Sequence, residues 1–424
     1  MKRKWIGLML CAALLAGCAG EAGSSDASAE VPGGGIQRMD IRQELEPVKT
    51  ENAFEKAAYF GDMVYQCQPN QNTLVSPLSL DMALGLAAEG SAGDTAKELA
   101  DYLGREDYGT FAKEYLDANE EYRKRFEGFG QNGYQVRLEL ANSVWVEKTR
   151  KLKEEYKKKA SERFYAEVQN VDFRGAQVEK TVKQINRWCD TKTHGLIPQI
   201  ITKDSISPDL SVILINSLYF EAPWTESWSV REGTFTDFAG KETSQEMLYD
   251  GGNVYYENDQ ATAFGKSYMG GMTFVGILPK KTGEFTLSEL DLKSLMESRT
   301  GAYDVRMMMP KLDFDTTANN IVSILKAQGV SRAFDSGEAD FSGLLEMQGD
   351  EVTFISDIIQ KCKIELDENG TKAAAVTAIM METCEAVMEP KQVKTVYLDR
   401  PFAFLIYDEA NQQILFVGKV VSVE

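Results

Sequence analysis

The chain has 424 residues, 43% of them hydrophobic and 26% charged, and carries a formal net charge of −19 at pH 7. A chain of this length and composition can bury one large core, and its acidity disfavours binding to nucleic acid or to anionic membranes. The single histidine excludes a multi-histidine metal site, and neither a phosphate-binding glycine loop nor a dinucleotide motif occurs, so we expect no metal and no cofactor.

Residues 1–17 have the features of a bacterial lipoprotein signal peptide. Lys2-Arg3-Lys4 is a basic start, Trp5–Ala16 is an apolar core too short to span a bilayer, and Leu15-Ala16-Gly17-Cys18 resembles a lipobox. Cleavage would remove three basic residues, which gives a mature charge of −19 − 3 = −22, and would free Cys18 for lipid attachment. We therefore expect an exported protein, lipid-anchored on the extracellular side of the cell membrane or at the cell surface; a simple secretory signal is the alternative.

Residues 18–50 are expected to form a flexible tether, because the segment up to Gly35 is rich in Ala, Gly, Ser and Glu and lacks periodicity. No internal repeat and no composition break follows, so residues 51–424 are predicted to form one domain. The cysteines left in the mature body are widely spaced and form no CxxC pair, which predicts free thiols rather than a zinc site or disulfides. They are Cys67, Cys189, Cys362 and Cys384.

Hydrophobic periodicity predicts both helices and strands along the body. The predicted helices are one from about Glu51, Ser79–Ala88, one from Asp94 that stops at Gly104, Tyr108–Phe126, Lys153–Phe164 and Thr316–Gln328. The predicted strands are Leu138–Val146, Val212–Phe220, Thr273–Leu278, Tyr303–Met309, and a C-terminal hairpin of Phe402–Tyr407 and Ile414–Val421. This mixture predicts an α+β fold.

Two segments carry polar groups of interest. Val212–Phe220 is apolar except for Asn216 and Ser217, which predicts a central strand whose buried asparagine finds hydrogen-bond partners near the middle of a sheet. Five lysines between residues 151 and 159 could bind a polyanion, but a solvated helix face is the interpretation we favour.

An enzyme with a Ser-His or Cys-His nucleophile would have to use His194, the only histidine of the chain. It stands next to Gly195, where a turn residue is the more usual interpretation. We therefore expect no enzymatic activity. A hydrolase that depends on His194 is the alternative.

A long link from Glu368 to Glu389 joins two strand patterns near the C-terminus, where such links are normally short. Between Thr371 and Thr383 the only charges, Lys372 and Glu382, fall at even positions, so an extended strand would present one uncharged face to a core. Gly370 tolerates unusual backbone angles, as a hinge requires. The alternative is a surface helix, because alanine is a strong helix former.

The pattern Glu368-x-Gly370-Thr371-x-Ala373-Ala374-Ala375 resembles the inhibitory hinge of the reactive-centre loop in the serpin family. Further segments that resemble serpin motifs follow in family order and span about Glu51 to Glu424. They are Ser76-Pro77-Leu78-Ser79, Asn216-Ser217-Leu218-Tyr219-Phe220 with Trp224, Met309-Pro310-Lys311-Leu312, Ala339-Asp340-Phe341-Ser342-Gly343 and Arg400-Pro401-Phe402.

The resemblance implies a single α+β domain with about nine helices, three β-sheets and an exposed reactive-centre loop at about residues 368–390. It also implies a shutter in the centre of the main sheet, where Ser76 and Ser79 would be the partners of Asn216, and a breach near Trp224. Many serpins carry a histidine where this chain has Gln360, so the strength and pH response of the shutter are open.

The resemblance further implies a monomeric suicide substrate: a serine protease attacks the loop, forms an acyl-enzyme and is trapped when the cleaved loop inserts into the main sheet. Lys372 stands where inhibitory serpins often carry glutamate, and on the solvent side of an inserted strand we expect it to have little effect. A non-inhibitory, serpin-like surface binding protein is the alternative. The implied hinge residues are Glu368, Gly370, Thr371, Ala373, Ala374 and Ala375.

The family spacing, counted forward from Glu368, places the reactive bond at Cys384-Glu385. Counting back from Pro401 places it near Glu389. The absence of Arg and Lys before either bond points to an elastase-, chymotrypsin- or subtilisin-like target, with a papain-like cysteine protease as the alternative. Alternative reactive-bond residues are Met381, Thr383, Met388 and Glu389.

Overall fold

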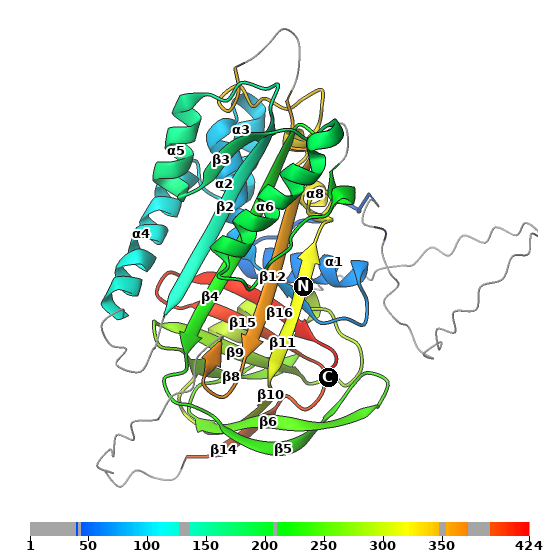
Figure 1. The fold of residues 1–424 in the computed structure, drawn as a ribbon. Coiled ribbons are helices and arrows are strands. Elements are labelled where there is room, and N and C mark those ends of the chain that lie inside the picture. Colours follow the sequence, from blue (N-terminus) through cyan, green and yellow to red (C-terminus); the bar gives the residue numbers. More distant parts are fainter. Residues whose placement is uncertain are drawn as a thin grey trace, which may run out of the picture. The chain divides into compact units, whose positions relative to one another are not determined.

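Three β-sheets and eight α-helices make up the part of the chain that the computed structural model describes, namely residues 40, 44–126, 136–206, 210–346, 353–371 and 391–423 (Figure 1). These residues belong to one unit, Ile36–Glu424. The α+β class and the three sheets are confirmed, and eight helices are close to the nine expected. The helices are α1 (Ala53–Cys67), α2 (Pro77–Gly90), α3 (Gly93–Leu103), α4 (Tyr108–Phe126), α5 (Glu154–Phe164), α6 (Val178–Lys192), α7 (Leu292–Glu297) and α8 (Ile321–Ala327).

The central sheet has the strand order β11-β12-β13-β4-β2-β3, a second six-stranded sheet has the order β1-β16-β15-β9-β8-β7, and a four-stranded sheet has the order β14-β10-β6-β5. The strands of the central sheet are β2 (Arg137–Glu147), β3 (Glu167–Val171), β4 (Val212–Pro223), β11 (Leu312–Ala318), β12 (Asp357–Leu366) and β13 (Gly370–Thr371). The other strands are β1 (Thr73–Val75), β5 (Ser229–Thr236), β6 (Glu242–Gly252), β7 (Tyr255–Glu257), β8 (Ala261–Ser267), β9 (Met272–Pro279), β10 (Asp304–Pro310), β14 (Val393–Tyr397), β15 (Phe402–Asp408) and β16 (Gln413–Val420).

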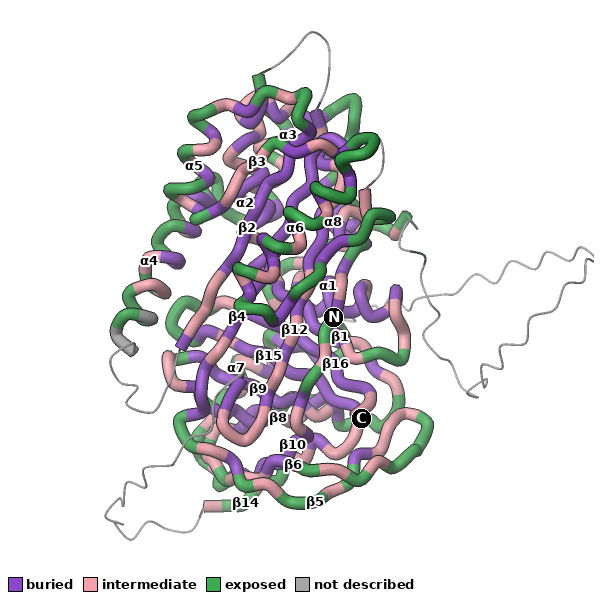
Figure 2. Tube along the Cα trace, in the orientation of Figure 1, coloured by how far each residue is buried: buried purple, intermediate pink, exposed green. Residues whose placement is uncertain are grey.

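Strand β4 is covered on both faces, as its apolar sequence predicts (Figure 2). Its even-numbered side chains, such as Leu214 and Leu218, join the large core on the side of α2. Its odd-numbered side chains, such as Ile213 and Tyr219, join a smaller core under α6. Helix α6, which the sequence analysis did not predict, crosses the front of this sheet (Figure 1). The two faces of the sheet therefore have separate cores.

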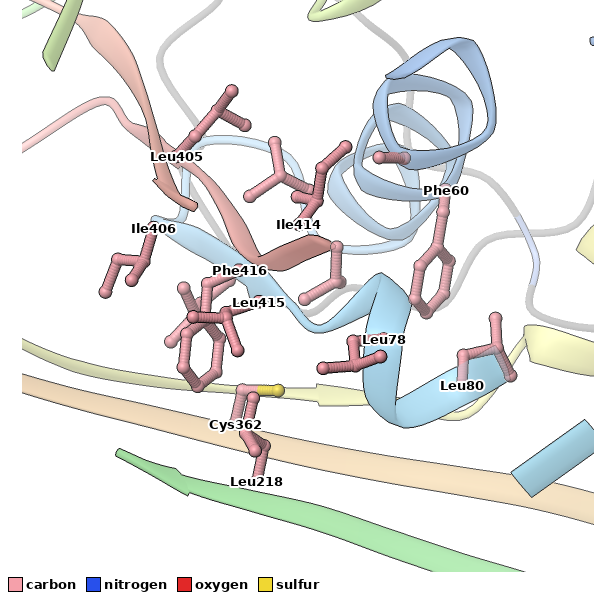
Figure 3. Packing of buried hydrophobic residues seen from close by; sticks show 14 of the residues in the cluster. Phe60, Leu78, Leu80, Leu218, Cys362, Leu405, Ile406, Ile414, Leu415 and Phe416 are labelled. Atoms are coloured by element: carbon pink, nitrogen blue, oxygen red, sulfur yellow. The ribbon is translucent and has the colours of Figure 1, made fainter. Parts of the chain in front are cut away.

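The large core unites the central sheet, α2 and the C-terminal hairpin. Figure 3 shows Leu218 of β4 and Cys362 of β12 on the side of the sheet where Leu78 of α2 and Phe416 of β16 also lie. Strands β15 and β16 pair antiparallel, so the predicted hairpin is confirmed. No helix in the described ranges is long and apolar enough to cross a membrane.

One predicted helix is wrong at its start. Hydrophobic periodicity predicted a helix over Thr316–Gln328, but Thr316 to Ala318 continue strand β11, where Thr316 pairs with Cys362 of β12. The two β-branched threonines fit a strand next to another strand, and pairing with β12 overrides the helical spacing of the later residues. The helix proper, α8, begins at Ile321.

Candidate functional site

The hinge lies inside the central sheet. Gly370 and Thr371 form β13, which pairs with Pro223 and Ala222 of β4 on one side. On the other side Thr371 pairs with Leu366 of β12, also antiparallel. Further along, β4 and β12 pair directly with each other, from Asp357↔Ile213 to Gln360↔Asn216. The hinge therefore separates β4 from β12 at one end of the sheet, whereas the two strands pair directly with each other in the middle.

Gly370 is required by the closeness of the neighbouring strand. A Cβ atom at this position would lie 2.3 Å from the carbonyl oxygen of Ala222 and 2.6 Å from the Cα of Pro223. Both are backbone atoms, which cannot move aside as a flexible side chain could. Any larger residue would therefore push β13 away from β4.

Thr371 is buried and faces the large core, where its hydroxyl lies 2.7 Å from the hydroxyl of Tyr268. The Tyr268 ring stacks on the indole of Trp224 with 4.0 Å between centroids, and burial raises the pKa of Tyr268 well above its usual value. The tyrosine is thus a neutral hydrogen-bonding group at the end of an aromatic stack. Trp224, which the resemblance places in the breach, therefore lies beside the hinge.

The turn formed by residues 367–369, which leads into the hinge, is held by hydrogen bonds from Trp224 and Trp228 and within the turn itself. The indole Nε1 of Trp224 donates to the carbonyl of Asp367 at 2.9 Å, and the backbone N–H groups of Trp224 and Trp228 donate to the carbonyls of Asn369 and Glu368. The Asp367 carboxylate accepts the N–H groups of Asn369 and Gly370, which closes the turn.

Glu368 anchors the outer side of the hinge through an ion pair. Its carboxylate lies 2.9 Å from the ammonium of Lys311, which also contacts Glu246 of β6 at 2.8 Å. Hydrogen bonding to Lys311 holds the pKa of Glu368 below its usual range. These ion pairs of Lys311 with Glu368 and Glu246 link the hinge to the four-stranded sheet. Lys311 belongs to one of the quoted motifs, but its partners could not be inferred from the sequence.

The predicted shutter residues are brought together as the resemblance implied. Gln360 Oε1 accepts the backbone N–H of Ser76 at 2.8 Å, while its Nε2 donates to the Ser76 carbonyl at 2.9 Å and to Asn216 Oδ1 at 3.1 Å. Asn216 Oδ1 also accepts the hydroxyl of Ser79 at 3.0 Å, and the Ser76 hydroxyl caps α2. These four side chains are buried. The glutamine thus bridges β12, β4 and the start of α2.

His194 sits just after α6 with a positive φ of 50°, in the turn position that its neighbour Gly195 suggests. Its Nε2 lies 3.0 Å from Glu139 Oε2, its Nδ1 lies 3.4 Å from Arg137, and its ring packs on Tyr219. These partners do not make it the base of a nucleophile pair.

Cys67, Cys189 and Cys362 are buried, and Cys189 and Cys362 are free thiols. Within the described ranges no cluster of His, Cys, Asp and Glu could hold a metal ion.

The lysine cluster is largely neutralised by acids on α5 and its neighbours. Lys157 pairs with Glu154, Lys159 pairs with Glu89 and Glu155, and Lys151 pairs with Glu346. These contacts favour the solvated-face interpretation over a polyanion site.

The remaining predicted site residues lie outside the described part of the chain. Tyr268 and Trp228 are hinge neighbours that were not predicted from the sequence, because only tertiary contacts bring them to Thr371 and Glu368. The undescribed residues are Cys18, Ala373, Ala374, Ala375, Met381, Thr383, Cys384, Glu385, Met388 and Glu389.

Comparison with known proteins agrees with this geometry. The serpin family model, described as serine protease inhibitor, matches residues 52–423. The chain is 31% identical over 373 residues to an uncharacterized serpin-like protein of Thermococcus kodakarensis, covering 83% of this chain and 81% of that protein. It is 29% identical over 378 residues to leukocyte elastase inhibitor A of Mus musculus, covering 84% and 94%.

A solved structure shows the same fold. The native state of tengpin, a thermophilic serpin, has a TM-score of 0.68 to this structure at 28% sequence identity and covers 90% of this chain and 98% of its own. A hinge paired at one end of the central sheet, a shutter closed by Gln360, and a family match over nearly the whole described body agree with one another: the chain belongs to the serpin family.

Proposed function

We propose that this serpin inhibits serine-type endopeptidases as a suicide substrate, trapping the protease as an acyl-enzyme when the cleaved loop inserts into the central sheet. The observation that carries the proposal is the position of Gly370 and Thr371 between β4 and β12. Because β4 and β12 still pair directly at Gln360 and Asn216, the sheet has further strand positions to offer once those two strands separate.

The side chains that follow Thr371 suit such an insertion. Thr371 faces the large core, so the odd-numbered residues after it would take the same side, and through Thr383 all of them are uncharged. Pairing a dozen residues at about 1 kcal/mol net per hydrogen bond would release on the order of 10 kcal/mol. That is comparable with the stability of a whole domain, which is about 5–15 kcal/mol. Insertion can therefore drive a large rearrangement of the complex.

The target that we propose is an elastase-, chymotrypsin- or subtilisin-like serine protease, cut at Cys384-Glu385. The absence of a basic residue before this bond disfavours trypsin-like enzymes. The relative in Mus musculus is an elastase inhibitor by name, which supports this class. We propose in addition that lipid on Cys18 anchors the exported protein to the cell membrane; loss of membrane association in Cys18→Ser would test this.

The inhibitory function is tested with the full chain bearing Cys18→Ser, incubated with elastase, chymotrypsin, subtilisin and trypsin. We expect a band of combined mass that survives denaturing electrophoresis with one of the first three enzymes, and mass spectrometry should place the cut after Cys384. The matched control is Thr371→Arg, which puts a charge where the structure has a buried hydroxyl. This variant should be cleaved without forming the covalent band.

Cleavage of the parent protein by every enzyme without a covalent band, and with no rise in thermal stability, would contradict the proposal. That result would favour a non-inhibitory binding protein built on the same fold.

A further inference from the structure

The strand register of β13 identifies which residues of β4 and β12 would flank the next residue of the loop if the loop inserted between these two strands. Thr371 stands opposite Ala222 of β4 and Leu366 of β12, antiparallel to both. One residue further along an inserting strand, the opposite residues are therefore Glu221 on β4 and Glu365 on β12. Successive side chains of a strand point to opposite faces, so this position faces away from Tyr268 and the large core.

Both glutamates share that face. Glu221 stands two residues after Tyr219, which lies in the smaller core on the side of α6, and therefore points to that side. Glu365 stands two residues after Lys363 and shares its face of β12. Glu221 accepts the hydroxyl of Tyr219 at 2.9 Å and lies 3.9 Å from Arg137, whereas Glu365 contacts Lys363 at 2.6 Å. Both are partly exposed, so each can accept a further cation without losing its present partner.

The residue that reaches this position is Lys372, which itself lies outside the described residues. Directly opposite cross-strand pairs of opposite charge stabilise a sheet, and like charges in the same place destabilise it. A lysine here would form two such pairs at once, because a strand inserted between β4 and β12 has a glutamate on each side. A glutamate in its place would face two like charges.

We propose that Glu221 and Glu365 form an acidic receptor for the ammonium of Lys372, so that the sheet selects a cationic residue as the first to enter after Thr371. The inference rests on the proposed loop insertion and refines it. It also replaces the expectation that Lys372 has little effect. Insertion of the strand would extend the existing Arg137–Glu221 pair across the sheet, through Lys372 to Glu365, which already contacts Lys363 on its own strand.

The next position on the same face does not repeat the charge match. By the same register Ala374 would lie between Tyr219 and Lys363, and neither alanine nor tyrosine is charged. The selection is therefore specific to one step, which lies directly beyond the hinge and ahead of Gln360 and Asn216, where β4 and β12 pair directly.

The test compares loop-cleaved and uncleaved protein, using the full chain with Cys18→Ser. Thermal unfolding midpoints are measured for the parent, Lys372→Gln and Lys372→Glu, in a fixed urea concentration that brings the cleaved form into range. Cleavage should raise the midpoint of all three. The rise should be smaller for Lys372→Glu by about 2–6 °C, with Lys372→Gln in between. The uncleaved midpoints should agree closely.

The matched control neutralises the receptor with the double substitution Glu221→Gln and Glu365→Gln, which keeps acceptor oxygens at both sites. In this background the difference between Lys372 and Lys372→Glu should shrink towards zero, as a double-mutant cycle requires for a direct pairing. The proposed receptor would be ruled out if cleavage raised the midpoint equally in all variants, or if the smaller rise of Lys372→Glu persisted in the neutralised background. Either result would leave the proposed function intact. Absence of any rise in the parent would overturn both.

Discussion

At the scale of single residues, the shutter shows how a glutamine can take the place of a titratable group. Gln360 uses both ends of its amide: the oxygen accepts from Ser76, and the nitrogen donates to Ser76 and Asn216. A neutral imidazole could not reproduce this set, because its single N–H donates one hydrogen bond whereas the amide nitrogen of Gln360 donates two. The glutamine therefore gives a network whose hydrogen bonds do not depend on a proton.

Replacing Gln360 with alanine should destabilise the protein by about 2–4 kcal/mol, because a buried N–H, a carbonyl and an amide oxygen each lose a partner and a small cavity opens. The free energy of unfolding from urea titration measures this. Gln392→Ala is the matched control, since Gln392 is exposed. A loss of less than about 0.5 kcal/mol at position 360 would show that water replaces the amide without cost.

The shutter should also be insensitive to pH. Burial raises the pKa of Cys362, whose thiol contacts Gln360, so this thiol stays neutral in the physiological range. In Gln360→His, burial should depress the imidazole pKa below its unfolded value, so stability should fall as pH drops through about 6.5. Parallel urea titrations between about pH 5 and pH 8 check this. A steeper pH dependence in the parent than in the variant would contradict it.

At the scale of elements, β14 pairs with β10 through the backbone and is also held to the body by the ammonium of Lys394. Lys394 pairs with Glu257 at 3.1 Å and lies 5.0 Å from the ring centroids of both Tyr255 and Tyr303. Glu257 also contacts Lys280 and accepts the Tyr255 hydroxyl. Because β14 directly follows the loop, these contacts hold the far end of the loop to the body.

Hydrogen bonding to Lys280, Tyr255 and Lys394 lowers the pKa of Glu257 to about 2. A carboxyl whose folded pKa lies below its unfolded value stabilises the fold fully above about pH 4.5 and loses this contribution as pH falls towards 2. Glu257→Gln should therefore cost about 1 kcal/mol at neutral pH, since the site is partly exposed. The difference from the parent should shrink below about pH 4.5.

Urea titrations of parent and variant at several pH values measure the difference, with Glu242→Gln, an exposed acid on β6, as the control. A difference that stays constant through the acid range would mean that Glu257 acts through packing rather than charge.

At the scale of the whole molecule, strands from distant parts of the sequence pair with each other within one six-stranded sheet. Strand β1 pairs with β16, so Thr73 stands opposite Lys419. Strand β16 also pairs with β15 and buries Leu415, Phe416 and Val417 in the large core. The core is therefore incomplete until the last residues are present.

A chain that ends at Asn411 should not fold cooperatively. Burial of Leu415, Phe416 and Val417 alone contributes roughly 5–9 kcal/mol, which is close to the whole stability of a domain. Circular dichroism during heating should show no sharp transition, whereas a chain lacking only Glu424 should unfold like the parent. A cooperative transition in the shorter chain would show that β1 and β15 form a stable sheet without β16.

Elements with strong local patterns could be predicted from the sequence. Strand β4 is nearly all apolar, and the two strands of the C-terminal hairpin surround a polar turn, so each was placed to within a few residues. Thr316 was assigned to a helix because its strand conformation depends on pairing with Cys362, which lies on a distant segment. Helix α6 was missed, although its apolar residues form the smaller core under the central sheet.

The residue types of the hinge and shutter were determined by the sequence alone. An asparagine within an apolar strand predicted a buried hydrogen bond, and the resemblance to the serpin family identified Gly370 and Thr371 as hinge residues. Only the tertiary structure decided which groups meet them: Tyr268 beside Thr371, Lys311 beside Glu368, and Glu221 with Glu365 around the next strand position. The reason is that strand register is a property of two or more segments at once, and a shift of one residue would turn every one of these side chains to the opposite face.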